Sequence, residues 1–351
     1  MGIEFKAREY IKNDESQVLE LLELVFERKV SSDYWNWKYF DTRLAGQSVV
    51  VTHIEDQIIG VSGGFYLETK LGENIYLTQY GGDEGVHPDY RRMGVATKME
   101  EIQKKIIERD GVKLFTAVST NPIVIKNRNK KKRPPFPKKI LEMVYVEDIK
   151  NTDWPLFKRL GYGVYKKTRK LLKGNNHVDR ITEFTETDSF GAEADVFWNK
   201  IVNYYSLMFK RDSNFLNWRY CDPRSGIFKV LSASKDGEML GYCSTLVKES
   251  KGTNMGYIMD LCVLPGMKTV VNGLLVRAMN CLKKEVNIIK YLVVEGHPNV
   301  PVFLGAGFAP NTSIYDIRYI ERHEDVREDF AQYYIAPSSR LFIQFGDTDL
   351  F

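Results

Sequence analysis

The sequence is poor in residues that hold metal ions or cross-link secreted proteins. It contains only five histidines and four cysteines among 351 residues. The cysteines are far apart, with no CxxC pair and no interleaved histidine: Cys221, Cys243, Cys262 and Cys281. This spacing disfavours a zinc site and a disulfide framework, and it predicts reduced thiols that fill the core. We therefore expect no metal cofactor.

Long apolar runs and a large net charge are also missing. No apolar run approaches membrane-spanning length. The first residues, Met1–Lys6, are too polar for a signal peptide and lack the Ser or Thr of a myristoylation signal. The net charge of only +4 disfavours a nucleic-acid-binding protein. We expect a cytoplasmic protein without a membrane or nucleic-acid partner.

Core-forming residues, by contrast, are abundant. Hydrophobic residues make up 43% of the chain and aromatic residues 13%. At 351 residues the chain is long enough for two domains of ordinary size. The composition therefore predicts a folded protein with full cores.

The segment Val86–Ala96, with the sequence VHPDYRRMGVA, is the most informative part of the chain. It leads from a strand through a short loop into a helix. Such a loop can direct free backbone N–H groups and the positive end of the helix dipole at an anion. Gly94 lets a phosphate approach the backbone, and Arg91 and Arg92 add donors suited to phosphate oxygens. An ordinary basic turn between a strand and a helix is the alternative.

The pattern Arg-x-x-Gly-x-Ala in this setting resembles the acetyl-CoA pyrophosphate loop of the GNAT superfamily of acyltransferases. Apolar residues repeat at helical spacing over Val95–Ile106, and Lys113–Val118 predicts the buried strand that follows. The resemblance implies an α/β fold with a mixed sheet, acyl-CoA as co-substrate and no metal. It implies these acyl-CoA-binding residues: Val86, Arg91, Arg92, Met93, Gly94, Val95, Ala96, Thr97 and Asn121.

The two halves of the chain contain a repeat. Residues Asn36–Arg43 match Asn217–Arg224 without gaps, at an offset of 181 residues. The same offset relates Gln57–Gly60 to Glu238–Gly241. Two matches at one offset predict tandem copies of one domain. The tryptophan that both copies share is expected to pack in the core rather than to stack on a ligand.

The polar stretch Gly174–His177 marks the predicted boundary between the copies. An N-terminal domain, residues 1–174, is expected to bind acyl-CoA, and a C-terminal domain, residues 175–351, to complete the acceptor site. At the corresponding place the second copy has the loop Pro265–Gly273, without paired arginines or the Arg-x-x-Gly-x-Ala pattern. We therefore expect two tandem GNAT-like domains, with a degenerate CoA loop in the second.

Attack of an amine on an acyl thioester needs a base that keeps the amine neutral. The resemblance implies that the pantetheine arm of acyl-CoA pairs near Val86, where Gly85 would allow a bulge. Asp83 and Glu84 are the nearest carboxylates. Because neighbours on a strand face opposite sides, one of them is the predicted general base, directly or through a water. A solvated or salt-bridged acidic pair is the alternative.

The departing thiolate must also be protonated. The resembled family usually supplies the proton from a tyrosine four residues before a Gly-Phe or Gly-Tyr pair. Here Phe157 stands before Gly161-Tyr162, and Phe303 stands before Gly307-Phe308. We expect the thiolate to leave unassisted or to take a proton from another group.

A basic run, Lys126–Lys139, holds eight Lys or Arg residues around a Pro-Pro-Phe-Pro sequence. Through Lys130 and Lys131 it is predicted to bind a diphosphate of the acceptor. A solvated basic loop is the alternative.

The C-terminus supplies further candidates for binding the amine. The pattern over Ser339–Phe345 predicts a strand, and the chain then ends in an acidic turn. Asp347, Asp349 and the terminal carboxylate of Phe351 are the candidates. A strand that simply completes the sheet is the alternative.

Two GNAT-like domains with one CoA loop resemble tandem GNAT N-acyltransferases. Length and layout are similar to those that act on nucleotide-linked amino sugars. The resemblance implies N-acylation of a small-molecule amine, with a dTDP-type amino sugar as the expected acceptor, by direct attack on the thioester. The alternatives are a GNAT acetyltransferase for another amine (aminoglycoside-like, protein lysine or RNA) and a non-catalytic acyl-CoA-binding module. A monomer or dimer is expected.

Overall fold

The computed structural model describes residues 4–41, 43, 45–131, 133–148, 161–163, 182–250 and 253–349. The chain divides into two compact units. The first comprises Met1–Phe136 and Asp316–Ala331, and the second comprises Pro137–Tyr315 and Gln332–Phe351. The predicted boundary at residues 174 and 175 lies outside the described residues, so a division of the chain at that point stays a prediction.

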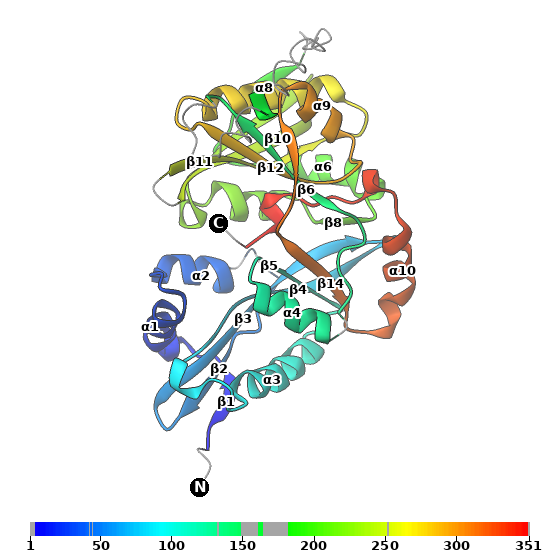
Figure 1. Ribbon diagram of the computed structural model, residues 1–351. Helices are drawn as coiled ribbons and strands as arrows, with labels where there is room; N and C mark the ends of the chain where they lie inside the picture. Colours follow the sequence, from blue (N-terminus) through cyan, green and yellow to red (C-terminus); the bar gives the residue numbers. More distant parts are fainter. Residues whose placement is uncertain are drawn as a thin grey trace. The chain divides into compact units, whose positions relative to one another are not determined.

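The first unit is built on a mixed sheet with the strand order β1-β2-β3-β4-β5-β14 (Figure 1). The strands are β1 (Lys6–Glu9), β2 (Val50–Ile54), β3 (Gln57–Leu71), β4 (Asn74–Val86), β5 (Leu114–Ser119) and β14 (Asp316–Glu321). Neighbours are antiparallel except for β4 and β5, which run parallel. The strand that completes this sheet, β14, comes from the C-terminal part of the chain and pairs with β5.

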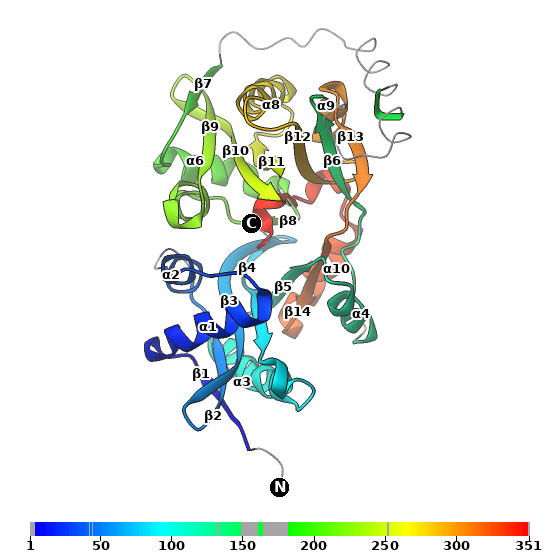
Figure 2. The same cartoon turned by 60° about the vertical axis from the view of Figure 1, so that its left-hand side comes forward.

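Helices cover both faces of the first sheet (Figure 2). They are α1 (Glu15–Phe26), α2 (Ser32–Phe40), α3 (Val95–Arg109) and α4 (Pro122–Lys130). Gly60 of β3 lets α3 pack closely, because a Cβ there would lie 2.8 Å from a methyl group of Val95. On the opposite face, a Cβ at Gly63 would collide with Tyr39 of α2. The sheet therefore has an α2 face and an α3 face.

The predicted helix after the loop is confirmed as α3. Val95, Met99 and Ile106 are buried in one cluster with Val50 and Ile59 of the sheet. The apolar stripe forms this helix because its residues return to the same side every three or four positions, and burying them stabilises the unit. The predicted strand after the helix is confirmed as β5, and α4 follows it directly.

The second unit has its own mixed sheet, with the order β13-β6-β12-β11-β10-β9-β7. The strands are β6 (Ile140–Val146), β7 (Glu183–Glu186), β9 (Phe228–Lys235), β10 (Glu238–Ser250), β11 (Thr253–Val263), β12 (Ile288–Val294) and β13 (Ala309–Thr312). The central parallel pair is β11 and β12, and β6 lies antiparallel to β12. Thus β6, from before the predicted boundary, belongs to the second sheet, just as β14, from after it, belongs to the first.

Helical segments and a short strand complete the second unit. They include α6 (Ala192–Ile201), β8 (Leu207–Phe209), α7 (Ser213–Leu216), a π-helical turn (Asn217–Cys221), α8 (Lys268–Leu282) and α9 (Asn299–Gly305); α10 (Arg327–Ile335) begins in the first unit. The predicted apolar stripe of the second copy is buried in α8: Val271, Leu275, Ala278 and Leu282.

The sequence repeat has a structural counterpart in each unit. Trp37 and Trp218 are each only 3% exposed, as expected for packing residues. In α2 the box ends with an ion pair between Arg43 and Asp41, at 2.8 Å. The corresponding pair in the second unit, Arg224 with Asp222, is 2.7 Å long.

The predicted strand over Ser339–Phe345 is wrong. The segment begins with a 3₁₀ turn, Ser338–Arg340, and makes an isolated bridge between Leu341 and Leu207 of the second unit. A second 3₁₀ turn, Phe345–Asp347, follows. Consecutive residues from Leu341 to Phe345 are all buried, so the segment lacks the exposed alternate positions of an edge strand. Among the described residues, no helix has the length and apolarity to cross a membrane.

Candidate active site

The loop before α3 has the geometry of an anion cradle. Gly94 is the N-cap residue of α3, with φ +91°, and no side chain caps the helix there. The first N–H groups of a helix have no partner within the helix and are available to a ligand. No described protein atom lies within 4 Å of the position that a Cβ of Gly94 would take. Arg91 and Arg92 are exposed on this loop. These residues fit a bound diphosphate.

The other predicted cofactor residues surround this loop. Met93 is 49% exposed, and Ala96 and Thr97 are exposed in the first turn of α3, whereas Val95 is buried against the sheet. The backbone carbonyl of Val86 accepts a hydrogen bond from Arg91 Nε, at 3.2 Å.

Asn121 lies further away in the fold, at the end of β5. Its side chain caps α4 by accepting a hydrogen bond from the Ile123 N–H, at 2.9 Å. The residue is exposed. Its contact with the pantetheine arm stays a prediction.

Strands β4 and β5 separate next to this loop. Their pairing runs only from Thr78 opposite Leu114 to Tyr80 opposite Thr116. Beyond that point β4 continues along β3 as far as Val86. The edge of β4 from residue 81 to residue 86 therefore has no strand pairing with β5. An extended ligand could form backbone hydrogen bonds along such an edge.

A β-bulge lies in the separated part of β4. Gly82 pairs with Gly63 and Gly85 pairs with Val61, so Asp83 and Glu84 together lie opposite a single residue of β3. Asp83 takes a left-handed backbone conformation, with φ +46°. The bulge thus occurs before Gly85 rather than at it, because Asp83 supplies the irregular conformation.

Asp83 is held by α2. Its carboxylate accepts hydrogen bonds from Lys38 Nζ at 2.5 Å and from the Tyr39 hydroxyl at 2.8 Å. The Lys38 side chain is only 2% exposed. Burial favours the neutral acid, but the Lys38 charge and these hydrogen bonds outweigh it and hold the pKa of Asp83 below its usual value. An ionised, fully engaged carboxylate of low pKa is a poor general base.

Glu84 points toward the α3 face instead. Its side chain is exposed at the surface of the strand. Partial desolvation and the negative charge of Glu100 on α3 raise the pKa of Glu84 above its usual value. Positive charges oppose this shift without cancelling it; they belong to Lys131, Arg133 and Arg128. Of the two predicted carboxylates, Glu84 is the one with the properties of a base that works near neutral pH.

The basic run lies next to α3. Lys131 Nζ is 3.1 Å from one carboxylate oxygen of Glu100, and Arg133 Nη2 is 3.2 Å from the other. Lys130 is exposed at the end of α4. Whether Lys130 and Lys131 bind the acceptor stays a prediction.

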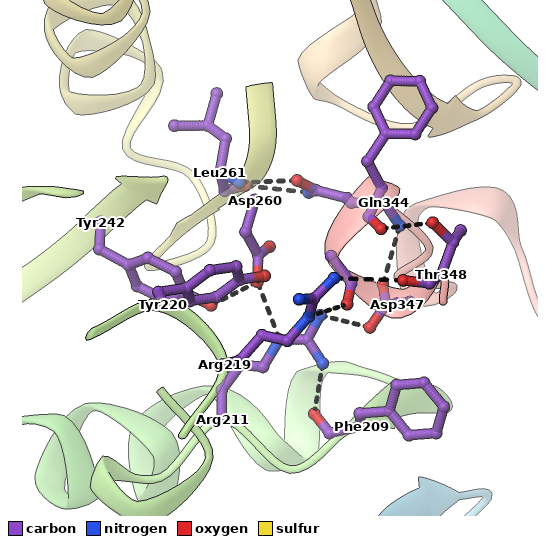
Figure 3. Close-up of polar contacts among 12 residues, drawn as sticks. Phe209, Arg211, Arg219, Tyr220, Tyr242, Asp260, Leu261, Gln344, Asp347 and Thr348 are labelled. Carbon is purple, nitrogen blue, oxygen red and sulfur yellow. Dashed lines mark hydrogen bonds and ion pairs between the residues drawn. The ribbon is translucent and has the colours of Figure 1, made fainter. Parts of the chain in front are cut away.

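In the second unit, the edge that corresponds to the free part of β4 is occupied. Pairing of β11 with β12 ends at Ile258 opposite Tyr291. Further along β11, the Leu261 N–H donates to Gln344 Oε1 at 2.6 Å, and Gln344 Nε2 donates to the Leu261 carbonyl at 3.0 Å (Figure 3). The C-terminal segment (residues 338–349) therefore satisfies the backbone of β11 with a side-chain amide.

The positions in the two units correspond closely. Val86 lies opposite Gly60, and Val263 lies opposite Gly241, its repeat partner. Counting back two residues from each valine makes Leu261 the counterpart of Glu84.

Counting back three residues makes Asp260 the counterpart of Asp83. Tyr220 donates to Asp260 at 2.9 Å, as the matching Tyr39 does to Asp83. The repeat thus includes a buried Tyr–Asp hydrogen bond that ungapped comparison of the sequence misses.

Asp347 lies inside this second network. Its carboxylate accepts from Arg211 Nη2 at 2.5 Å and from the Gln344 N–H at 2.8 Å. Arg211 and Asp260 are fully buried. Burial, aided by the charge of Asp260, raises the pKa of Asp347 to about 6 against the opposing effect of Arg211. The structure therefore gives Asp347 an anchoring contact, as Figure 3 shows.

Of the other C-terminal candidates, Asp349 is half-buried and Phe351 lies outside the described residues. Within the part of the chain that is described, no group of three or more His, Cys, Asp or Glu side chains is arranged to hold a metal.

Several site residues escaped the sequence analysis. Lys38 and Glu100 are ordinary helical charges in the sequence, and their importance comes only from contacts with Asp83 and with the basic run. Gln344 has no local signal at all. The conserved spacing of the repeat could have led from Tyr39 to Tyr220, but not to their partners.

Known proteins show what this site resembles. Residues 6–127 match the family model of the GNAT acetyltransferase domain. No curated protein matches the chain. A probable N-acyltransferase from Enterococcus faecalis has a similar structure, with a TM-score of 0.62 at 11% identity, over 91% of this chain and 72% of that one. A GCN5-related N-acetyltransferase from Anabaena variabilis gives the same values.

N-myristoyltransferase from Saccharomyces cerevisiae, solved with bound myristoyl-CoA and inhibitors, has a TM-score of 0.59 at 7% identity, over 90% of this chain and 80% of that one. At such identities the likeness shows the fold, which matches the expected arrangement of two GNAT-like units. Residues 6–127 thus carry a GNAT acetyltransferase domain, and together with the fold this supports an acyl-CoA-dependent N-acyltransferase.

Proposed function

We propose that the chain transfers an acyl group from acyl-CoA to the amine of a small acceptor, with Glu84 as the general base. The observation that carries this proposal is the bulged edge of β4. It leads from the cradle at Gly94 to a carboxylate of raised pKa within one strand. A single acyl-CoA along that edge would present its thioester near Glu84.

The reaction follows from these positions. The N–H groups of the first turn of α3, with Arg91 and Arg92, would hold the diphosphate of acyl-CoA. The amine nitrogen attacks the thioester carbonyl, a C–N bond forms, and the C–S bond breaks. Glu84 takes the proton that the amine loses, directly or through a water. The thiolate leaves with the electron pair of the C–S bond, which its moderate basicity permits.

For Asp83 we propose a positioning role. Its ion pair with Lys38 fixes the left-handed residue of the bulge. Fixing the bulge orients the next side chain, that of Glu84, toward the α3 face. Asp83 would then act on the reaction only through the geometry of Glu84.

For the acceptor we propose a nucleotide-linked amino sugar of the dTDP type. This part rests on the likeness in length and two-unit layout to enzymes of that kind. The competing acceptors are other small amines, a protein lysine and RNA. A module that binds acyl-CoA without turnover is the non-enzymatic competitor.

Release of free CoA thiol tests the proposal directly. Wild-type protein is incubated with acetyl-CoA or a longer acyl-CoA and a panel of amines that includes dTDP-amino sugars, and the product mass is measured. Amine-dependent thiol release with a matching acylated product supports the enzyme. Saturable acyl-CoA binding without release from any amine supports the binding module. Acylation of another amine, with the dTDP-sugars inert, would replace the acceptor but keep the reaction.

A further inference from the structure

A positive patch on the α3 face of the first unit carries more charge than its ion pairs neutralise. We call it the α4 patch, and it consists of Lys131, Arg133 and Arg322. Glu100 contacts both Lys131 and Arg133, so one negative charge serves two positive ones. Arg322 follows β14 and thus reaches this face from the C-terminal part of the chain.

Two guanidinium groups of the patch share one aromatic ring. Arg322 Cζ lies 4.9 Å from the ring centroid of Phe115, and Arg133 Cζ lies 6.0 Å from it. Desolvation and the charge of Arg133 lower the pKa of Arg322. Like charges held this close raise the free energy of the protein, and a bound anion would lower it. The surplus charge therefore calls for an anionic ligand.

The supporting framework of the patch is well ordered by hydrogen bonds. Arg128 of α4 contacts Asp316 of β14 at 3.1 Å, and Arg318 bonds the same carboxylate at 2.9 Å. Arg318 also donates to the backbone carbonyl of Arg133. These contacts fix the end of α4 and the backbone of Arg133, which reduces the entropy cost of binding a ligand there.

The patch lies close to the diphosphate cradle. Glu100, which holds Lys131 and Arg133, is six residues after Gly94 on the same helix, a distance of about 9 Å along the axis. Coenzyme A carries its 3′-phosphate on the ribose attached to the diphosphate. One molecule of acyl-CoA can therefore present an anion to the cradle and a second anion to the patch.

We infer that the α4 patch binds the ribose 3′-phosphate of acyl-CoA, with Arg133 and Arg322 as its principal donors and Lys131 as a supporting charge. This inference rests on the proposed function, since it assumes acyl-CoA in the cradle. It assigns the basic run to the acyl donor, and the diphosphate of the acceptor is then bound elsewhere.

Comparison of CoA with 3′-dephospho-CoA tests the inference by calorimetry. The full-length variant Arg133→Ala/Arg322→Ala should bind CoA about 10–100-fold more weakly, since each lost charge-assisted contact has a large effect. Its affinity for dephospho-CoA should stay within about twofold of wild type. Glu100→Gln should act in the opposite direction and favour CoA over dephospho-CoA more strongly, because it frees the patch. Lys104→Ala, which removes an exposed charge paired with Glu108 on the same helix, is the matched control.

The outcomes separate the inference from the proposed function. Equal weakening of both ligands by the double variant would overturn the 3′-phosphate site. So would unchanged CoA affinity, and a higher acceptor KM in that case would return the basic run to the acceptor. If wild-type protein binds neither CoA nor dephospho-CoA, the proposed function itself fails. If the double variant unfolds, Arg322→Lys, which keeps the charge but loses the forked donor, should give a smaller loss for CoA and none for dephospho-CoA.

Discussion

Two adjacent residues of one bulge, Asp83 and Glu84, should respond to substitution in opposite ways. Glu84→Gln removes a base that is exposed and makes no ion pair among the described contacts, so the free energy of unfolding should change by no more than about 0.5 kcal/mol. Asp83→Asn removes the partner of a buried ammonium, Lys38, which is 2% exposed. We expect that substitution to destabilise the protein by about 3–5 kcal/mol.

The kinetic effects should be reversed. Loss of a general base lowers kcat/KM by about 10²–10⁴, which corresponds to about 3–5 kcal/mol of transition-state stabilisation. We expect that loss for Glu84→Gln at neutral pH. The difference from wild type should narrow at high pH, where solvent deprotonates the amine without help. Asp83→Asn should retain more activity than Glu84→Gln, measured well below its unfolding temperature.

The pH dependence gives a second, independent signature. Because the pKa of Glu84 is raised, kcat/KM of wild type should begin to fall at a higher pH than an ordinary glutamate would produce, and Glu84→Gln should lose this acid limb. For Asp83 the sign is opposite. Its native pKa is lowered, so its ion pair stabilises the fold above the usual aspartate pKa of about 4. This contribution is lost as the pH falls toward the native value.

Urea unfolding and pH–rate profiles of both variants provide the measurements. A wild-type profile for Glu84→Gln would refute Glu84 as the base. A large kinetic loss in Asp83→Asn, with unchanged stability and a lost acid limb, would assign that role to Asp83. If both variants kept wild-type profiles, a C-terminal carboxylate or a chain of waters would become the leading candidate.

Three further substitutions probe the cradle and the second unit. Gly94→Glu should abolish CoA binding, whereas Gly266→Glu, at a glycine of similar φ and similar empty surroundings in the second loop, should leave CoA affinity unchanged; equal losses in calorimetry would reject a single site. Because the native pKa of Asp347 is raised to about 6, its burial makes the protein less stable as the pH rises from about 4 to about 6, and Asp347→Asn should remove that part of the pH dependence of urea unfolding. Arg211→Ala should cost about 3–5 kcal/mol, since it leaves the carboxylates of Asp260 and Asp347 buried without their cation, and an unchanged melting temperature would contradict this.

Local sequence patterns predicted the parts of the fold that depend on local periodicity and turn chemistry. The loop at Gly94 and the apolar stripe of α3 are of this kind, because helix geometry and positive φ leave direct traces in the sequence. The burial of Trp37 and Trp218 followed from the repeat.

Features that arise from long-range contacts could not be predicted in this way. The position of the bulge depends on Asp83, a residue whose positive φ is sustained by Lys38 and Tyr39 from another helix. Pairing of β14 with β5 joins segments about 200 residues apart, and no local pattern specifies it. The counterpart Asp260 was hidden because the offset between the copies changes from 181 to 177 residues between the tryptophan box and this strand.

The amide of Gln344 has a thermodynamic consequence for the second unit. A ligand that is part of the same chain is always present at a high effective concentration, of the order of millimolar for a short flexible tether. A free acyl-CoA would have to exceed that concentration, or bind far more tightly, to displace it from Leu261. The second unit therefore carries a permanent competitor at its strand edge. Changes in cellular acyl-CoA concentration should alter the occupancy of the first unit alone.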